Sequence, residues 1–230
     1  MDITLMPDGE FAELYHQAIR QLNNSFSIEV VKGERKNIGP SASSIASCAS
    51  KQYLDIVHPD DDDADIPDSS WAMLMGHFGQ LVMAQVLTAM GYTISEQETE
   101  VSVDGIGAHI DGEISGLDIK EPLIWDAKVK NLYALDEMLT KGVQIAEPGI
   151  YYQMQVYMLA RDRPAALLTV SPHDVSGFRR EIVYKRKREV ASETIHRFLV
   201  LADKEAQALA MSRAATVAAA VAVGLPPTRE

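Results

Sequence analysis

The pattern of apolar positions in the first 90 residues has the spacing of helices. Apolar side chains recur every three or four residues, and each run begins at a residue type that caps helices. The pattern predicts three helices, at Asp8–Leu22, from Ser41 or Ser43 to about Val57, and from a cap at Asp68–Ser70 to Met90. The third is rich in Met, Leu, Val and Ala, so we expect it to be central and buried. The acidic run Asp60–Asp63 between these helices is typical of a solvated loop, because consecutive carboxylates point in different directions.

Beyond Gly91 the apolar positions alternate as they do in strands, and helical segments interrupt the strands. The predicted strands are Tyr92–Asp104, Gly107–Ser115, Pro122–Val129, Ala165–Ser171 and Phe178–Tyr184. The predicted helices are Leu132–Lys141, Gly149–Ala160 and one long Ala-rich helix from Lys187 to about Val221. This order predicts a mixed α/β fold in a single domain over residues 1–230, with a C-terminal helical extension over 186–225.

Composition and charge exclude few classes of protein. About half of the 230 residues are hydrophobic, as in ordinary globular domains, and the formal net charge is −12. Such a charge argues against wholesale neutralisation of phosphates, although an acidic enzyme can hold DNA with a local basic patch and a metal ion. The single cysteine, Cys48, excludes an internal disulfide. The acidic residues 1–10 do not read as a signal peptide, and the apolar stretch Ala214–Leu225 is too short and alanine-rich to span a bilayer. We therefore expect a cytoplasmic protein with no membrane partner.

Candidate chemistry is found on two neighbouring predicted strands. Asp111 stands in an otherwise apolar segment beside a glycine, and the next strand contains Asp126-Ala127-Lys128. Side chains on a strand repeat every second residue, so Asp126 and Lys128 share one face. If the strands pair, Asp111 and Asp126 lie close together, and a cation between them would relieve their repulsion. Carboxylate and carbonyl oxygens suit Mg²⁺ or Mn²⁺.

These residues form a working set for phosphodiester hydrolysis. The metal would lower the pKa of its bound water and offset phosphate charge, and Lys128 would position that water and stabilise the transition state. The alternative is a surface ion pair across two strands, and Asp-x-Lys by itself favours that alternative, because such tripeptides are common.

A polar pair on the following helix supports the catalytic interpretation. Gln153 and Tyr157 are separated by one helical turn, so they share a face on a helix whose other positions are core-like. Both side chains can donate to a phosphate oxygen or hold a water. The alternative is a packed tyrosine ring and a glutamine that bridges backbone groups.

The order of these motifs resembles a known family. A Gly76-His77 helix start, Gly-x-x-x-Asp ending at Asp111, the Asp-x-Lys strand and the Gln-x-x-x-Tyr helix occur in the order typical of the PD-(D/E)XK nuclease superfamily. The resemblance is to its RecB-like branch, which includes phage-type exonucleases, and covers roughly residues 41–185. It implies a restriction-endonuclease-like core, in which a mixed central β-sheet is flanked by helices.

The resemblance also implies a role for each matching residue. Asp111 and Asp126 match the metal-binding acids, the carbonyl of Ala127 matches a usual third ligand, and Lys128 matches the catalytic lysine. Gln153 and Tyr157 match the substrate-side motif, and His77 matches a histidine that can join the metal shell. Two departures are that Asp126 stands where Glu is commoner and that Gln80 stands where a Glu often follows the histidine.

Three further residues have open interpretations. His109 is two residues before Asp111 and is either a partner of the metal ligands or a histidine packed at a strand edge. Glu113 is a candidate ligand of a second metal. Cys48 resembles the first cysteine of an iron–sulfur cluster in some RecB-like nucleases, but the other three cysteines are missing, and we expect a buried thiol on a helix.

A set of basic residues is a candidate DNA groove. Its members are Lys128, Lys130, Lys141, Arg161, Arg163, Arg179, Arg180 and Lys185–Arg188. No base-reading motif is apparent, so we expect backbone recognition with little sequence preference. Partners would be DNA and either a second copy of the chain, through the long C-terminal helix, or a recombination protein. The leading hypothesis is a Mg²⁺- or Mn²⁺-dependent deoxyribonuclease, with exonuclease favoured by the family resemblance. The alternatives are an inactive nuclease-fold module that binds DNA or a protein, and an unrelated hydrolase of small phosphoesters.

Overall fold

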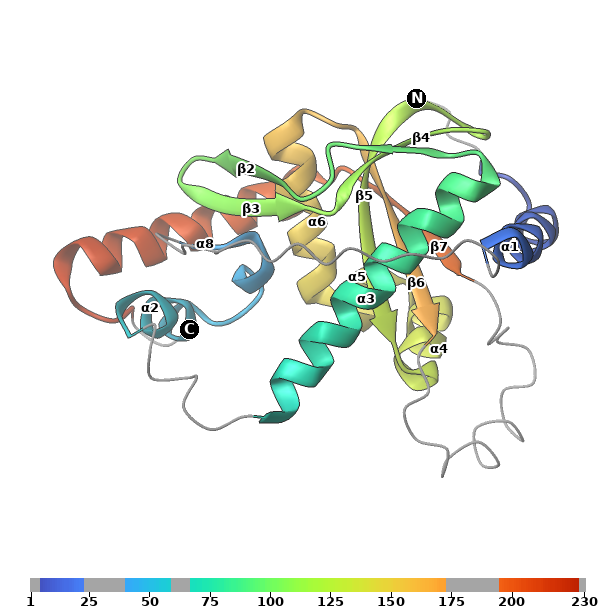
Figure 1. Ribbon diagram of the computed structural model, residues 1–230. Helices are drawn as coiled ribbons and strands as arrows, with labels where there is room; N and C mark the ends of the chain where they lie inside the picture. The colour runs from blue at the N-terminus through green and yellow to red at the C-terminus, as the bar shows by residue number, and fades with distance from the viewer. Residues whose placement is uncertain (1–4, 23–39, 59–66, 173–194, 228–230) are drawn as a thin grey trace.

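The computed structural model describes residues 5–22, 40–58, 67–172 and 195–227 (Figure 1). Its centre is a five-stranded sheet in the order β1-β4-β5-β6-β7. These strands are β1 (Thr93–Ser95), β4 (Gly112–Gly116), β5 (Ile119–Lys130), β6 (Ala165–Pro172) and β7 (His196–Leu201). Strands β5 and β6 are parallel and the other pairs are antiparallel. A separate antiparallel pair, β2 (Thr99–Val103) and β3 (Ile106–Ile110), extends from the sheet as a hairpin.

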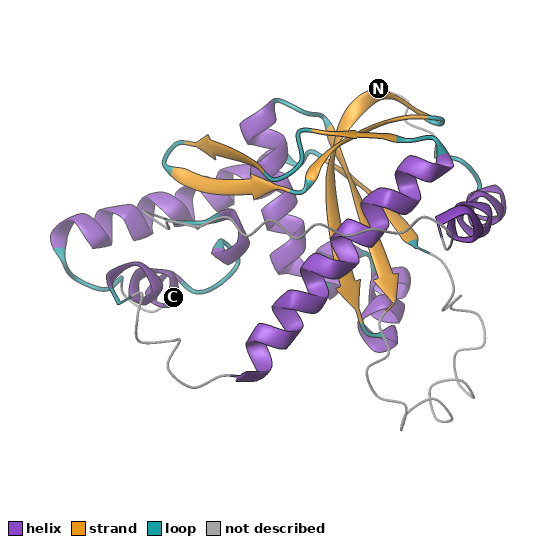
Figure 2. Ribbon diagram, in the orientation of Figure 1, coloured by secondary structure: helices purple, strands orange, loops and turns teal. Residues whose placement is uncertain are grey.

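Helices lie on both sides of the sheet (Figure 2). Helices α1 (Asp8–Leu22) and α3 (Pro67–Met90) share one hydrophobic cluster with the sheet. The opposite cluster includes α4 (Leu132–Lys141), α5 (Val143–Ala146), α6 (Pro148–Arg161) and α8 (Lys204–Val223). The short η1 (Ala42–Ser44) packs against α6, and α2 (Ala49–Val57) packs against α8. The predicted mixed α/β architecture, a central sheet flanked by helices, is confirmed.

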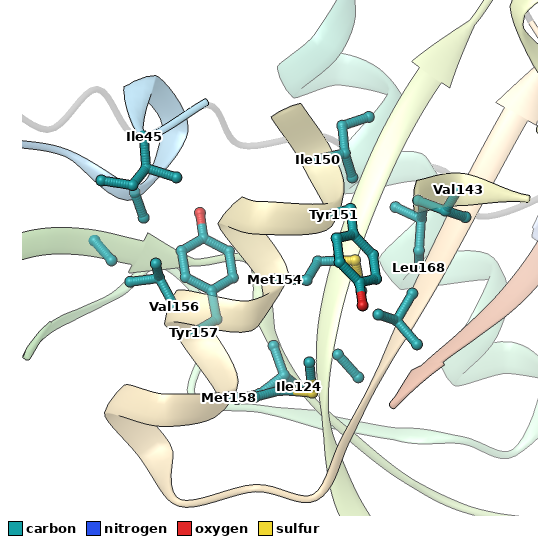
Figure 3. Close-up of a cluster of buried hydrophobic side chains, with 14 of the residues drawn as sticks. Ile45, Ile124, Val143, Ile150, Tyr151, Met154, Val156, Tyr157, Met158 and Leu168 are labelled. Carbon is teal, nitrogen blue, oxygen red and sulfur yellow. The ribbon is translucent and has the colours of Figure 1, made fainter. Parts of the chain in front are cut away.

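Side chains along β5 point alternately to the two faces of the sheet, and this alternation places the candidate site on one face. Trp125 and Ala127 are buried in the cluster on the α3 side, whereas Ile124 is buried in the cluster on the α6 side. Figure 3 shows Ile124 beside Met158 of α6. Asp126 and Lys128 are two and four residues after Ile124, so their side chains leave the sheet toward the α6 side.

One glycine brings α3 close to the strand that carries these residues. A Cβ atom at Gly79 would overlap the side chain of Val129 on β5, so only glycine fits at this crossing. This close approach sets the helix segment with His77 and Gln80 beside the end of β5.

The first and middle helices agree closely with the sequence predictions. The structure confirms Asp8–Leu22 and Leu132–Lys141 at the predicted bounds, and α3 and α6 lie within two residues of theirs. Strands β5 and β6 were also predicted. The expected loop Asp60–Asp63 and strand Phe178–Tyr184 lie outside the described residues.

Three predicted elements are wrong because each is interrupted. The helix expected from Ser41 or Ser43 to Val57 is η1 and α2, separated at Ser47 and Cys48. The strand expected over Tyr92–Asp104 is β1 and β2, because Glu96 and Glu98 adopt a left-handed backbone (φ 52° and 51°) that breaks the ladder. The strand expected over Gly107–Ser115 is β3 and β4, which join different sheets on either side of Asp111.

The single C-terminal helix expected from Lys187 to Val221 is also wrong. Within the described residues, His196–Leu201 form β7, which pairs with β6 and completes the sheet. The helix α8 starts only at Lys204, where the Asp203 carboxylate accepts hydrogen bonds from the backbone N–H groups of Glu205 and Ala206. By length and composition, α8 is the one described helix long and apolar enough to cross a membrane. In the folded chain its alanines at 206, 210 and 214 are buried in the cluster around α6.

A buried ion pair fixes the N-terminal segment to the far end of the sheet. Arg197 Nη1 lies 3.0 Å from Asp118 Oδ2, and the Arg197 guanidinium stacks 3.9 Å from the centroid of the Phe11 ring. Tyr92 Oη donates to Asp118 Oδ1 at 2.6 Å, and the Met6 N–H donates to Asp118 Oδ2. Burial acts to raise the pKa of Asp118, but these donors and the guanidinium outweigh burial and lower it.

We expect Asp118→Asn to lower the free energy of unfolding by about 2 kcal/mol, because it leaves the buried Arg197 without its counter-charge. A carboxyl whose pKa is lowered in the folded state stabilises the protein at pH values above the ordinary pKa of that carboxyl. This contribution is lost as the pH falls through the folded-state pKa. The difference between variant and wild type is therefore full at neutral pH and shrinks below about pH 4. Urea unfolding at several pH values measures it, and a difference that does not change with pH would contradict the assignment.

Candidate active site

The fold brings Asp111, Asp126 and Lys128 together beside a cleft, which Asp111 and Lys128 line and from which Asp126 is buried. Asp111 lies in the link between β3 and β4, and Asp126 lies within β5. The Ala127 N–H donates to Asp111 Oδ2 at 2.7 Å, which fixes this carboxylate against β5. Lys128 Nζ lies 2.8 Å from Asp126 Oδ1 and 4.0 Å from Asp111 Oδ2. One ammonium therefore contacts both acids, and Asp126 and Lys128 lie on the same face of β5, as the strand alternation predicted.

The two carboxylates carry more negative charge than their surroundings offset. The Asp126 side chain is fully buried (0% exposed), and its Oδ2 has no hydrogen-bond partner among the described residues. Burial and the neighbouring charge of Asp126 raise the pKa of Asp111 to about 7, against the lowering effects of Lys128 and the Ala127 N–H. A buried carboxylate oxygen without a donor, beside a second carboxylate, fits a cation.

Lys128 keeps its charge in this environment. Burial acts to lower the pKa of its ammonium, but the charges of Asp126 and Asp111 outweigh burial and raise that pKa. The side chain is 25% exposed and lines the cleft. Lys128 can therefore donate to a group in the cleft while it pairs with Asp126.

The cleft beside these residues has a volume of about 640 Å³ and walls from three parts of the fold. Helix α3 contributes His77 and Gln80, and α6 contributes Gln153 and Tyr157. The segment at η1 and the β2–β3 hairpin contribute the third wall, with Ser41, Ser43, Glu100, Ser102 and His109. Half of the polar side chains that line the cleft carry hydroxyl or amide donors, which suits a ligand with several oxygen acceptors.

Gln153 and Tyr157 meet as their spacing predicted. Gln153 Nε2 donates to Tyr157 Oη at 2.5 Å, and both residues line the cleft. Figure 3 shows the Tyr157 ring on the side of α6 that faces Ile45, away from Tyr151. The ring is buried (3% exposed), so its hydroxyl has a fixed place in the cleft wall.

The remaining predicted ligands are less closely defined. His77 is an exposed residue of α3 on the cleft wall, and His109 lines the same cleft. Across the described ranges, no group of three or more His, Cys, Asp or Glu side chains is close enough to hold a metal ion. The roles of His77 and of the Ala127 carbonyl as metal ligands therefore stay predictions.

Glu98 is a neighbour of the site that the sequence did not indicate. Its charge acts to raise the pKa of both Asp111 and Lys128, and it accepts a 2.6 Å hydrogen bond from Gln80 Nε2. The alternation of apolar residues placed Glu98 inside one continuous strand. The turn between β1 and β2 directs Glu98 to the site, and the local sequence pattern does not predict that turn.

Most of the described basic residues expected along a DNA groove are already paired. Arg161 and Arg163 contact Glu113, Lys130 contacts Glu147, and Lys141 contacts Glu137. Glu113, a candidate ligand of a second metal from the sequence, therefore has two arginine neighbours. The residues Arg179, Arg180 and Lys185–Arg188 lie outside the described residues.

The expectation of a buried thiol at Cys48 is wrong. Cys48 is exposed, because the break between η1 and α2 places it before the first turn of α2.

Comparison with solved structures supports the nuclease resemblance at the level of the fold. No protein-family model matches the sequence, and no curated protein sequence matches it. An alkaline exonuclease from Laribacter hongkongensis superposes with a TM-score of 0.57 at 14% identity, over 81% of this chain and 89% of that chain. A phage-related exonuclease from Haemophilus somnus 129PT superposes with a TM-score of 0.53 at 13% identity, over 79% and 92%. The Laribacter enzyme is also known in complex with dAMP, and that structure gives a TM-score of 0.55 at 15% identity, over 81% and 89%. The chain has the fold of these exonucleases.

Proposed function

We propose that this chain, which shares the fold of alkaline and phage-related exonucleases, is a divalent-metal-dependent deoxyribonuclease. The observation that carries the proposal is the pair Asp111 and Asp126 beside the cleft, with a buried carboxylate oxygen that lacks a donor among the described residues and with Lys128 in contact with both acids. A surface ion pair would be solvated on all sides, whereas Asp126 is fully buried.

Asp111 and Asp126 would hold Mg²⁺ or Mn²⁺, and the Ala127 carbonyl and His77 are further candidate ligands. When bound, such an ion lowers the pKa of a water and offsets charge on the scissile phosphate. The carboxylates hold their positions without it, because the Ala127 N–H fixes Asp111 and the Lys128 ammonium fixes Asp126.

Lys128 would act on the substrate side of the carboxylates. Its ammonium remains charged and partly exposed to the cleft, where it can orient the attacking water and donate to a phosphate oxygen as negative charge develops. Gln153 and Tyr157 lie on the α6 wall of the same cleft and can donate to other oxygens of the bound strand.

Gln153→Ala and Tyr157→Phe should each lower kcat/KM by about tenfold, mainly through KM, because each removes a donor that binds substrate. Steady-state cleavage of labelled DNA measures this effect, with Tyr133→Phe on the far helix α4 as the matched tyrosine control. An unchanged kcat/KM in both variants would remove these two residues from the site.

Exonuclease action is the form that we propose, because the neighbouring structures are of exonucleases. DNA is the proposed partner, bound through its backbone. The neutral donors of the cleft can contact phosphate and sugar oxygens, which carry no direct sequence information.

The test is cleavage of labelled linear single- and double-stranded DNA with Mn²⁺, Mg²⁺ or EDTA. We expect release of nucleotides or short products with either metal and none with EDTA. Closed circular DNA should resist cleavage if the enzyme needs an end. Binding of DNA without cleavage under every metal condition would instead favour an inactive nuclease-fold module.

A further inference from the structure

Glu113 is a buried acid next to the candidate site that the proposed chemistry does not use. It lies on β4, two residues after Asp111, and its side chain is only 5% exposed. Arg161 donates to Glu113 Oε1 through Nε at 3.0 Å and lies 2.9 Å away through Nη2. Arg163 Nη2 donates to Oε2 at 2.7 Å. Both carboxylate oxygens are therefore engaged by guanidinium groups.

These arginines mark the end of the helix that carries Gln153 and Tyr157. Arg161 is the last residue of α6, and Asp162 ends the helix in a left-handed conformation (φ 50°, ψ 48°). The Arg163 N–H then donates back to the Met158 carbonyl at 2.9 Å. This turn directs both arginine side chains of one helix end to a single acid on β4.

The contact links the two halves of the candidate site. Asp111 immediately precedes β4, and Gln153 lies eight residues before Arg161, about 12 Å along a rigid helix. Anchoring the helix end to β4 therefore limits how far α6 can slide or tilt relative to Asp111. A buried ion pair contributes little net stability over an apolar contact, but it imposes a definite geometry.

We propose that Glu113, held by Arg161 and Arg163, is a positioning residue that sets Gln153 and Tyr157 at a fixed separation from the carboxylates. The proposal rests on the proposed nuclease function. Two other roles are outcomes of the test: Glu113 as a ligand of a second metal, and the arginines as phosphate contacts.

The test is a double-mutant cycle between Glu113→Gln and Gln153→Ala, measured as kcat/KM for linear DNA. Glu113→Gln keeps the size of the side chain and removes the charge that pairs with both arginines, which leaves Arg161 with Glu96 at 3.5 Å. Misplacement of a substrate-binding group by about 1 Å can cost up to about 100-fold, so we expect a loss of at least tenfold. In that background Gln153→Ala should cost less than about threefold, against about tenfold alone, because Gln153 is already displaced.

Binding of Mn²⁺ to the DNA-free protein, measured by calorimetry, separates the outcomes. It should change less than about twofold in Glu113→Gln, because neither oxygen of Glu113 is available to a metal. A matched loss of Mn²⁺ affinity would make Glu113 a ligand and overturn the proposal. Equal effects of Gln153→Ala in both backgrounds would overturn it as well.

Two further variants test whether the loss of kcat/KM in Glu113→Gln comes only from lost stability. Asp118→Asn breaks a comparably buried ion pair away from the cleft, so it should lower stability and leave kcat/KM within twofold. Arg163→Gln removes one of the two guanidinium contacts to Glu113 and keeps the one from Arg161, so it should show a smaller non-additivity of the same sign with Gln153→Ala, even if Glu113→Gln does not fold. A cleavage-inactive wild type would refute the proposed function itself, whereas an active wild type with an additive cycle refutes only the positioning role.

Discussion

Asp126→Asn is expected to abolish DNA cleavage, with a loss in kcat of at least about 10³-fold. The substitution keeps the shape of the side chain and removes the charge that the proposed metal requires. It also converts one of the two acids around Lys128 into a neutral amide, so the ammonium retains only Asp111 at 4.0 Å.

The same substitution should separate function from stability. In the metal-free protein, Asp126 is a fully buried charge with one unpartnered oxygen, and its charge contributes to the raised pKa of Asp111. An amide at this position removes the buried charge and its repulsion of Asp111, so metal-free Asp126→Asn should be at least as stable as the wild type. Active sites often hold such unfavourable charge in exchange for function.

Two measurements check this prediction. Calorimetry should show at least a tenfold weaker affinity for Mn²⁺, and thermal unfolding should show a smaller increase in Tm on addition of Mn²⁺ than in the wild type. Asp118→Asn is the matched control at the other end of β4 and β5, and it should keep wild-type Mn²⁺ affinity. An Asp126→Asn enzyme that cleaves at more than a tenth of the wild-type rate would contradict the role of Asp126.

The sequence predicted which side chains come together better than it predicted the elements around them. Asp126 and Lys128 share a face because strand alternation is a local property, and Gln153 and Tyr157 meet because helical spacing is local too. Nothing in the Asp-x-Lys tripeptide distinguishes a surface ion pair from a catalytic group. The full burial of Asp126 makes that distinction, and burial depends on how α6 and the β2–β3 hairpin close over β5.

The errors arose where pairing in space overrides local pattern. His196–Leu201 stands in a long polar and alanine-rich run that favours helix, yet it forms a strand because β6 offers it an open edge. Similarly, Asp111 interrupts what looked like one strand because β3 and β4 pair with different partners. The pairing of Glu113 with Arg161 and Arg163 joins residues about 50 positions apart, so no spacing rule could indicate it.

Lys128→Met should also inactivate the enzyme, but for a different reason. We expect kcat to fall by about 10²- to 10³-fold, as for loss of a group that stabilises developing charge in the transition state. Methionine fills a similar volume without charge or donors. Unlike Asp126→Asn, this variant leaves both carboxylates intact.

Metal binding should therefore distinguish the two inactive variants. Removal of the ammonium 2.8 Å from Asp126 takes a competing cation away from the carboxylates, so Mn²⁺ should bind to Lys128→Met at least as tightly as to the wild type. The metal-free variant should be less stable than the wild type, because the fully buried Asp126 and the partly buried Asp111 then face each other without a counter-charge, and Mn²⁺ should raise its Tm by more than it raises that of the wild type.

Lys120→Met provides the control for this experiment, because Lys120 is an exposed residue of the same strand and does not line the cleft. It should retain wild-type cleavage and Mn²⁺ affinity. If Lys128→Met loses Mn²⁺ binding together with cleavage, Lys128 acts by holding the carboxylates in place. If it binds Mn²⁺ and still cleaves within threefold of the wild-type rate, the ammonium has no part in the chemical step. Tight metal binding without cleavage is the result that assigns Lys128 to the catalytic step. It would show that the two carboxylates bind the metal without the lysine, and that cleavage still requires the ammonium.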